Sequence, residues 1–148
     1  MIVLVTSSRE WDDALRIYHV LDFVWRCCRE AGSGLAPESL TLRHGGARGG
    51  DTITHDWATR KYDDGLPITP ESHPAQWHLY GKRAGLIRNG EMVQSGDIDL
   101  CLAFSRDGSS GTADCMAKAR EAHIPVWFHP HGLPSGPPPP ARLILPRL

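Results

Sequence analysis

Two glycine-rich segments, HGGARGGDT at 44–52 and DGSSGTAD at 107–114, each follow an apolar run and precede a run with helical spacing. Strand, glycine turn and helix in this order direct backbone N–H groups and a helix N-terminus at an anion. We call residues 44–52 the first glycine turn and residues 107–114 the second glycine turn. Because the arrangement occurs twice in one small chain, the sequence predicts a single pocket for a phosphate-bearing ligand.

Strand-like and helix-like runs alternate along most of the chain. The predicted strands lie at 1–5, at 40–42, within 65–74, at 98–104 and at 125–128. The predicted helices lie at 14–28, from Asp51 onward, at 80–94 and along 113–120, and glycines at 31–34 are expected to end the first of them. This alternation predicts an α/β fold in which a mostly parallel five-stranded sheet carries helices on both faces. Prolines allow only a short or edge strand within 65–74.

Composition restricts the class of protein. The chain has 148 residues, 41% of them hydrophobic, and a net charge of −1, which is typical of one ordinary globular domain without a general attraction for polyanions. We expect residues 1–129 to form that domain and residues 130–148 a proline-rich tail. No apolar run is long enough for a membrane helix, and the start reads as a strand rather than a signal peptide. Four cysteines without CxxC spacing favour reduced thiols and a cytoplasmic location.

Three turns after predicted strands can form one binding site, because ligands of open α/β sheets bind beyond the carboxyl ends of the strands. TSSR, HGGARGGD and SRDGSSGT supply hydroxyls, glycines that permit close backbone approach, and arginines that pair with phosphate. RNGEM adds a further arginine and an asparagine from another helix. The predicted ligand-binding residues are Ser7, Ser8, Arg9, Gly45, Gly46, Arg48, Asp51, Trp77, Arg88, Asn89, Gly108, Ser109, Ser110, Gly111 and Thr112. Neither the GxGxxG nor the GxxxxGK[ST] fingerprint is present.

Some of these side chains also have a purely structural interpretation. Asp51 serves equally well as a helix cap or as a ribose ligand. Trp77 and Tyr80, which precede the arginine-bearing helix, are candidates for stacking on a base. We expect His129 and His131 to be solvated in the tail, and we predict neither a metal site nor a cofactor. The remaining tryptophans, assigned to the core, are Trp11, Trp25, Trp57 and Trp127.

Three segments carry a resemblance to a known family: HGGARGGDTITHDWA, PAQWHLYGKRAGLIRNGEM and GTADCMAKAREAHIPV. In this order they resemble the YspA-like branch of the SLOG superfamily, which also holds the LOG phosphoribohydrolases and the DNA-processing protein DprA. The resemblance runs from TSSREW to Val126. It implies a Rossmann-like, doubly wound fold that binds nucleotides in its glycine turns, and dimers in which one subunit completes the site of the other.

The resemblance to the hydrolytic LOG proteins is incomplete. Their Arg four residues before a Met corresponds to Arg88, which makes Arg88 a predicted catalytic residue. Their GGxGTxxE signature corresponds here to DGSSGTADC, in which Cys115 replaces the final Glu and Ser109 replaces the second glycine. Asp114 stands one residue earlier and is the second predicted catalytic residue. A one-residue displacement rotates a helical side chain by about 100°, so binding is better supported than hydrolysis.

Three functions follow from these residues. The first is a sensor or sequestering protein that binds a nucleoside phosphate or an ADP-ribose-like molecule. The second is a nucleoside 5′-monophosphate phosphoribohydrolase that cleaves the N-glycosidic bond, with Arg88 on the phosphate or ribose and Asp114 or Asp51 on the sugar cation. The third is single-stranded nucleic-acid binding, for which the cluster KRAGLIR at 82–88 is the only local basic stretch. We expect the first, with a homodimeric assembly and no membrane partner.

Overall fold

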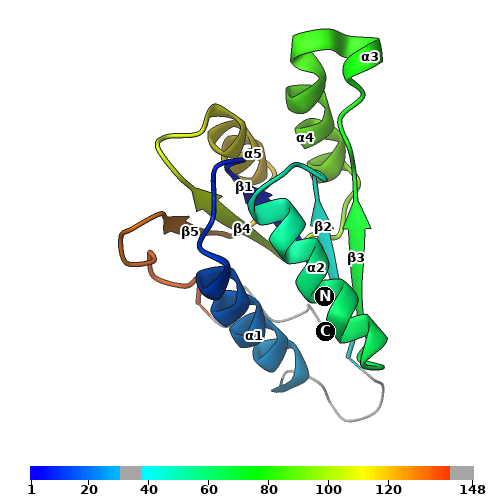
Figure 1. The fold of residues 1–148 in the computed structure, drawn as a ribbon, viewed down its shortest axis with the longest axis vertical. Coiled ribbons are helices and arrows are strands. Elements are labelled where there is room, and N and C mark those ends of the chain that lie inside the picture. The colour runs from blue at the N-terminus through cyan, green and yellow to red at the C-terminus, as the bar shows by residue number, and fades with distance from the viewer. Residues whose placement is uncertain (31–37, 141–148) are drawn as a thin grey trace.

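A fully parallel five-stranded sheet in the order β3-β2-β1-β4-β5 forms the centre of the computed structural model, which describes residues 1–30 and 38–140 (Figure 1). The strands are β1 (Ile2–Ser7), β2 (Leu40–His44), β3 (Ile68–Ser72), β4 (Leu100–Ser105) and β5 (Val126–Pro130). The helices are α1 (Ala14–Glu30), α2 (Gly50–Asp63), α3 (Trp77–Tyr80), α4 (Ala84–Gln94) and α5 (Ser110–Glu121). The predicted end of the first helix at 31–34 lies outside the described residues. The α/β, doubly wound, Rossmann-like prediction is confirmed.

Strand order reverses at the centre of the sheet. The chain moves outward from β1 through β2 to β3, then returns to place β4 on the other side of β1. β1 therefore lies between β2 and β4, and its residue Val3 pairs with Leu42 of β2 on one side and with Leu100 of β4 on the other. A doubly wound sheet binds ligands at such a reversal, outside the carboxyl ends of the strands. The fold therefore brings the turns after β1, β2 and β4 to one edge.

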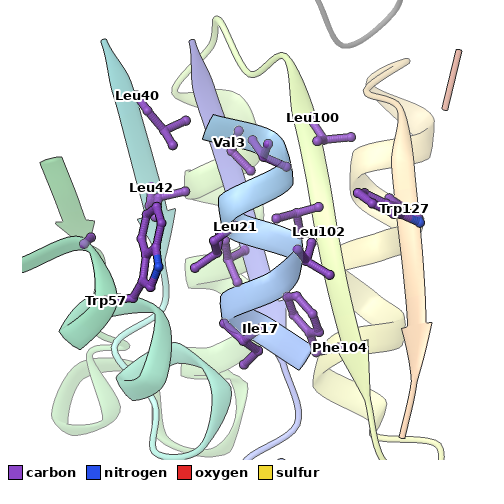
Figure 2. Packing of buried hydrophobic residues seen from close by; sticks show 14 of the residues in the cluster. Val3, Ile17, Leu21, Leu40, Leu42, Trp57, Leu100, Leu102, Phe104 and Trp127 are labelled. Carbon is purple, nitrogen blue, oxygen red and sulfur yellow. The ribbon is translucent and has the colours of Figure 1, made fainter. Parts of the chain in front are cut away.

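Alternation along the strands fills two hydrophobic layers. Val3, Val5 and Leu102 point to the face that α1 and α2 cover, together with Leu21 and Trp57 (Figure 2). The other face is covered by α4 and α5. Its buried side chains are Leu4, Met92, Cys101, Cys115, Ala119 and Ile124. Both faces of the central strands are thus removed from water, which explains their uninterrupted apolar sequence.

One predicted helix differs in detail, and the predicted edge strand is confirmed. The helix expected at 80–94 is divided into α3, a 3-10 turn at Gly81–Arg83, and α4. Gly81 adopts φ 57°, a left-handed conformation that ends α3. The run at 65–74 does form an edge strand, because β3 pairs only with β2 among the described strands and places Pro70 opposite Leu42.

The segment after β5 folds back onto the domain. Gly136 N–H donates to the Phe128 carbonyl at 2.9 Å, and Trp127 Nε1 donates to the Gly136 carbonyl at 2.8 Å. The expectation that His129 is solvated is wrong: it is fully buried in β5, stacked on Phe104 with its Nδ1 2.7 Å from Ser135 Oγ. Burial lowers the pKa of His129 to about 4. Its alternating position in β5 and the return of Ser135 onto that strand together set its environment.

The predicted core tryptophans are confirmed. Trp11, Trp57 and Trp127 are buried, and Trp25 packs against the same cluster while partly exposed. The four cysteines are free thiols. Within residues 1–30 and 38–140, no helix combines the length and apolarity needed to cross a membrane.

Candidate functional site

A cavity of about 530 Å³ opens at the carboxyl edge of the sheet. Its walls come from the turns after β1, β2 and β4 and from α3 and α4, which project beyond the sheet next to the end of β3 (Figure 1). The predicted site residues that line it are Ser7, Ser8, Arg9, Gly45, Asp51, Trp77, Arg88, Asn89, Ser109, Ser110 and Gly111. Its volume is suitable for a nucleotide-sized ligand.

Four predicted residues lie elsewhere. Gly46 and Arg48 line an adjoining hollow of about 390 Å³, whose wall also contains Arg9, Trp77 and Arg88. Arg48 is paired with Glu10 at 2.6 Å in an exposed contact. Gly108 and Thr112 do not line either hollow. The last two are parts of the second glycine turn, and Thr112 Oγ1 is buried without a hydrogen-bond partner among the described residues.

Arg88 is held rigidly at the wall between the two hollows. Its guanidinium donates to the carbonyls of Gly45 at 2.5 Å and His73 at 3.3 Å, and Nε donates to Asn89 Oδ1 at 3.1 Å. A Cβ at Gly45 would lie 2.3 Å from Arg88 Nη1, so only glycine allows this approach. The first glycine turn therefore positions a cation at the cavity.

Asn89 connects the same helix to the second glycine turn. Its Nδ2 donates to the Gly111 carbonyl at 3.2 Å and to Asp114 Oδ2 at 3.1 Å, and the residue is buried. Asp114 also pairs with Lys118 at 2.8 Å. Asp114 does not line the cavity, but it accepts a hydrogen bond from Asn89, which does. The predicted catalytic pair is thus separated, with Arg88 at the cavity and Asp114 behind its wall.

Asp51 is a buried carboxylate in the cavity wall. It is 4% exposed and follows the first residue of α2. Burial raises the pKa of Asp51 to about 7, against the opposing effects of the Ala47 N–H and of Arg88. The cap interpretation is wrong, because Gly49 is the N-cap of α2 and no side chain caps that helix.

The second glycine turn leaves the N-terminus of α5 open toward the cavity. Ser109 is the N-cap of α5, and its side chain makes no capping hydrogen bond. Ser109, Ser110 and Gly111 line the cavity in succession. Asp107 and Gly108 adopt φ values of 54° and 66°, which turn the chain sharply after β4. Free N–H groups and the positive end of the helix dipole are suited to an anion here.

The turn after β1 braces the site. Ser8 Oγ accepts from Arg106 N at 2.8 Å and donates to the Arg106 carbonyl at 3.3 Å, so its hydroxyl ties the β1 and β4 ends together. The guanidinium of Arg9 stacks over Trp77 at 5.3 Å and joins this turn to α3. Trp77 remains 47% exposed. Its ring is therefore an accessible aromatic surface at the cavity mouth.

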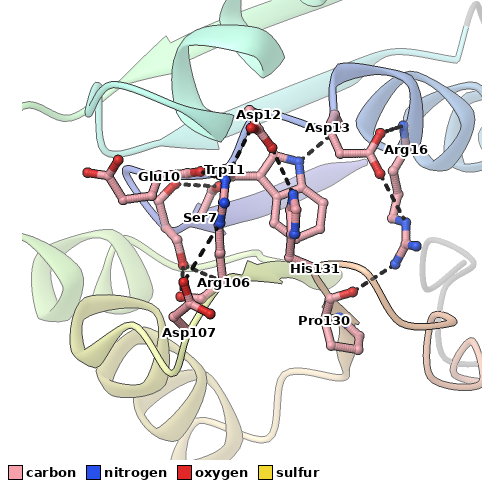
Figure 3. A network of polar contacts seen from close by, with 11 residues as sticks. Ser7, Glu10, Trp11, Asp12, Asp13, Arg16, Arg106, Asp107, Pro130 and His131 are labelled. Carbon is pink, nitrogen blue, oxygen red and sulfur yellow. Dashed lines mark hydrogen bonds and ion pairs between the residues drawn. The ribbon is translucent and has the colours of Figure 1, made fainter.

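A polar network fixes the rim beside β4 (Figure 3). Arg106 pairs with Asp12 at 3.1 Å and donates to the Glu10 carbonyl at 2.9 Å. His131, from the segment after β5, contacts the same Asp12 at 2.8 Å and packs edge-on against Trp11. The expectation of a solvated His131 is therefore wrong too. The network holds the β1 and β4 turns against the C-terminal segment.

Sequence reasoning did not select four charged residues that line the cavity: Glu10, Lys82, Arg106 and Asp107. Arg106 and Asp107 directly follow β4, so their place after a strand was the available signal. Lys82 is brought in by the 3-10 turn, which no sequence pattern indicated. The positive charges of Lys82, Arg106, Arg9 and Arg88 balance those of the acidic side chains in the lining, so an anionic ligand can bind in the cavity.

Comparisons with known proteins find a family model and a phage protein that resemble this chain. The protein-family model described as "YAcAr: YspA, cpYpsA-related SLOG family" matches residues 1–80. The Gene 61 protein of Mycobacterium phage D29 is 43% identical over 125 residues, which cover 84% of this chain and 92% of that protein. No solved structure gives a significant match.

Proposed function

This chain belongs to the YspA, cpYpsA-related SLOG family, and from that premise we propose that it binds a nucleotide or nucleotide-derived ligand as a sensor or sequestering protein. The ligand class is a nucleoside phosphate or an ADP-ribose-like molecule. One observation carries the proposal: Arg88 and the open N-terminus of α5 line the same cavity of about 530 Å³.

The phosphate of such a ligand fits best at the second glycine turn. The N–H groups at the start of α5 have no side-chain cap, so an anion can accept their hydrogen bonds. Ser109 and Ser110 line this part of the cavity and add hydroxyl donors. Arg88 supplies a positive charge in the lining of the same cavity.

The base of the ligand fits best against Trp77. Its ring is half-exposed at the mouth of the cavity, and Arg9 lies over it. A planar base can stack on such a ring, and an aromatic platform of this kind does not distinguish one base from another. The proposal therefore covers several nucleotides and leaves specificity to polar contacts elsewhere in the cavity.

Isothermal titration of the purified protein with AMP, ADP, ATP, NAD, ADP-ribose, cyclic nucleotides and ribose 5-phosphate tests the proposal. We expect at least one nucleotide to bind, and Arg88→Ala to weaken it by about tenfold to a hundredfold, since a charge-assisted contact to phosphate is lost. Arg29→Ala removes an exposed arginine near the C-terminus of α1 and is the matched control. Absence of binding across the panel, or equal binding by Arg88→Ala, would contradict the proposal.

A phosphoribohydrolase is the second candidate, and one observation favours it: a carboxyl, that of Asp51, lines the cavity together with Arg88. In this function Arg88 holds the phosphate or ribose, and Asp51, or Asp114 through Asn89, stabilises the cationic sugar of the transition state. Mass spectrometry of each bound nucleotide after incubation separates the candidates. Intact ligand supports binding alone, whereas free base and ribose 5-phosphate support hydrolysis.

A further inference from the structure

Only one of the two carboxyl oxygens of Asp51 has a hydrogen-bond donor among the described residues. Oδ2 accepts from the Ala47 N–H at 3.2 Å, within the first glycine turn. Oδ1 is buried and has no hydrogen-bond partner among the described residues. The residue is 4% exposed and lines the cavity. Oδ2 thus fixes the side chain, whereas Oδ1 has no donor among the described residues.

An unfilled acceptor of this kind is costly in the protein alone. A buried carboxyl oxygen without a donor loses its hydration and gains nothing in return. The charges of Arg88 and Arg9 and the N–H of Gly45 favour the ionised form of Asp51, but neither arginine hydrogen-bonds to it. The missing contact is therefore one that a ligand can supply, and the ligand group must donate a hydrogen bond.

The chemistry of this position excludes the phosphate. A phosphate monoester near neutral pH is largely dianionic, offers acceptors only and is repelled by a carboxylate. A hydroxyl is neutral, small and able to donate. Hydrogen bonds from neutral donors to a carboxylate are also among the stronger ones in proteins.

The order of strands places Asp51 between the two ends of the proposed ligand. Trp77 follows β3, Asp51 follows β2, and Ser109 follows β4 on the far side of β1. Along the carboxyl edge of the sheet, Asp51 therefore lies between the aromatic platform and the phosphate site. The ribose occupies the middle of every nucleotide, between base and phosphate.

We propose that Asp51 Oδ1 accepts a hydrogen bond from a ribose hydroxyl of the ligand, so that the cavity selects ribonucleotides over their deoxy counterparts. This inference rests on the proposed nucleotide-binding function. It adds a polar contact to the sugar. In the proposed function, Trp77 stacks on the base and the second glycine turn binds the phosphate.

Matched nucleotide pairs test the inference in the full chain. The affinities of AMP, 2′-deoxy-AMP and 3′-deoxy-AMP, and of the corresponding guanosine, cytidine and uridine pairs, are measured by titration at pH 8. We expect wild type to favour the ribonucleotide over at least one deoxy form by about tenfold to a hundredfold, as for a hydrogen bond to a charged group. Asp51→Asn should reduce this ratio to near one and leave the affinity for that deoxy form within threefold.

Asp56→Asn is the control, because it removes the same charge from an exposed position of the same helix and should keep the wild-type ratio. Equal binding of ribo and deoxy forms by wild type would overturn the inference and leave the proposed function standing. A ratio that persists in Asp51→Asn would overturn it as well. Failure of wild type to bind any nucleotide in these pairs or in the wider panel would remove the proposed function and the inference together. The wild-type ratio does not depend on how well a variant folds.

Discussion

The two glycine turns have similar sequences but opposite surroundings. In the first glycine turn, Gly49 and Gly50 are enclosed by protein. A Cβ at Gly50 would lie 1.9 Å from Ser7 Oγ, and one at Gly49 would lie 2.6 Å from the Arg9 carbonyl. The Gly46 N–H donates to Nδ1 of buried His44 at 3.0 Å, and burial lowers the pKa of His44 to about 4, which keeps that nitrogen an acceptor. The turn is therefore closed by packing around Gly49 and Gly50, while Gly45, Gly46 and Ala47 line the hollows.

The second glycine turn is open. A Cβ at Gly108 or Gly111 would meet nothing within 4 Å, and the N-cap Ser109 makes no side-chain capping bond. Glycine is thus needed in the first turn for close packing and in the second for chain direction and free space. The comparison teaches that glycines in a turn after a strand have two physical uses: they permit close packing, as at Gly49 and Gly50, or they leave free space beside a helix N-terminus, as at Gly108 and Gly111. In the first turn, Gly45, Ala47 and Asp51 line the cavity.

The largest expected effect on stability comes from adding a side chain at the packed end of the first glycine turn. In Gly50→Ala the added Cβ would lie 1.9 Å from Ser7 Oγ, 2.4 Å from Ser7 Cβ and 3.3 Å from Ile17 Cδ1. We expect the free energy of unfolding to fall by about 3 kcal/mol, since overpacking a well-filled interior displaces backbone as well as side chains. Chemical denaturation measures the loss. A variant as stable as wild type would show that the first turn is not tightly closed.

An intermediate effect on stability is expected from replacing Asp51, the buried carboxyl of the first glycine turn. Because burial raises the pKa of Asp51 to about 7, the folded state binds a proton that the unfolded state releases above pH 4. Its contribution therefore makes stability fall as pH rises from about 4 to about 7. Asn does not titrate, so Asp51→Asn should gain about 2 kcal/mol relative to wild type between pH 5 and pH 7.

Denaturation curves of both proteins across this pH range provide the measurement. The contributions of the buried histidines His44 and His129 are common to both proteins and cancel in the difference. A difference in unfolding free energy that stays constant with pH would show that Asp51 titrates near its ordinary pKa. A gain in stability on removing this carboxyl would also agree with a ligand-binding role rather than a structural one.

The smallest effect on folding is expected in the open turn. Gly111→Ala meets no atom within 4 Å, and alanine favours a helix more than glycine does, so the unfolding free energy should change by less than about 1 kcal/mol. The added methyl group occupies space at the cavity wall, and nucleotide affinity should fall severalfold. Equal loss of stability in Gly111→Ala and Gly50→Ala would break the distinction between the two turns.

The fold was predictable because hydrophobic periodicity and strand–helix alternation are local signals. The apolar runs that became β1 and β4 and the spacing that became α1 required no knowledge of distant contacts. The same signals predicted most of the residues in the cavity wall, because parallel strands bring the turns that follow them to one edge of the sheet. Lys82 was missed because it depends on the 3-10 turn after Gly81, and the burial of His129 was missed because it depends on residues that fold back onto β5. The separation of Asp114 from the cavity depends on the side chains of Asn89 and Lys118, which no spacing rule reveals.

The position of Trp77 makes the cavity optically observable. Among the tryptophans, Trp11, Trp57 and Trp127 are 2%, 4% and 8% exposed, whereas Trp77 is 47% exposed and lies under the guanidinium of Arg9. A base that stacks on this ring would displace water or the arginine from it, and its emission intensity and wavelength would change. The protein thus contains its own fluorescent reporter, and Trp77→Phe supplies the blank that separates this signal from the emission of the interior.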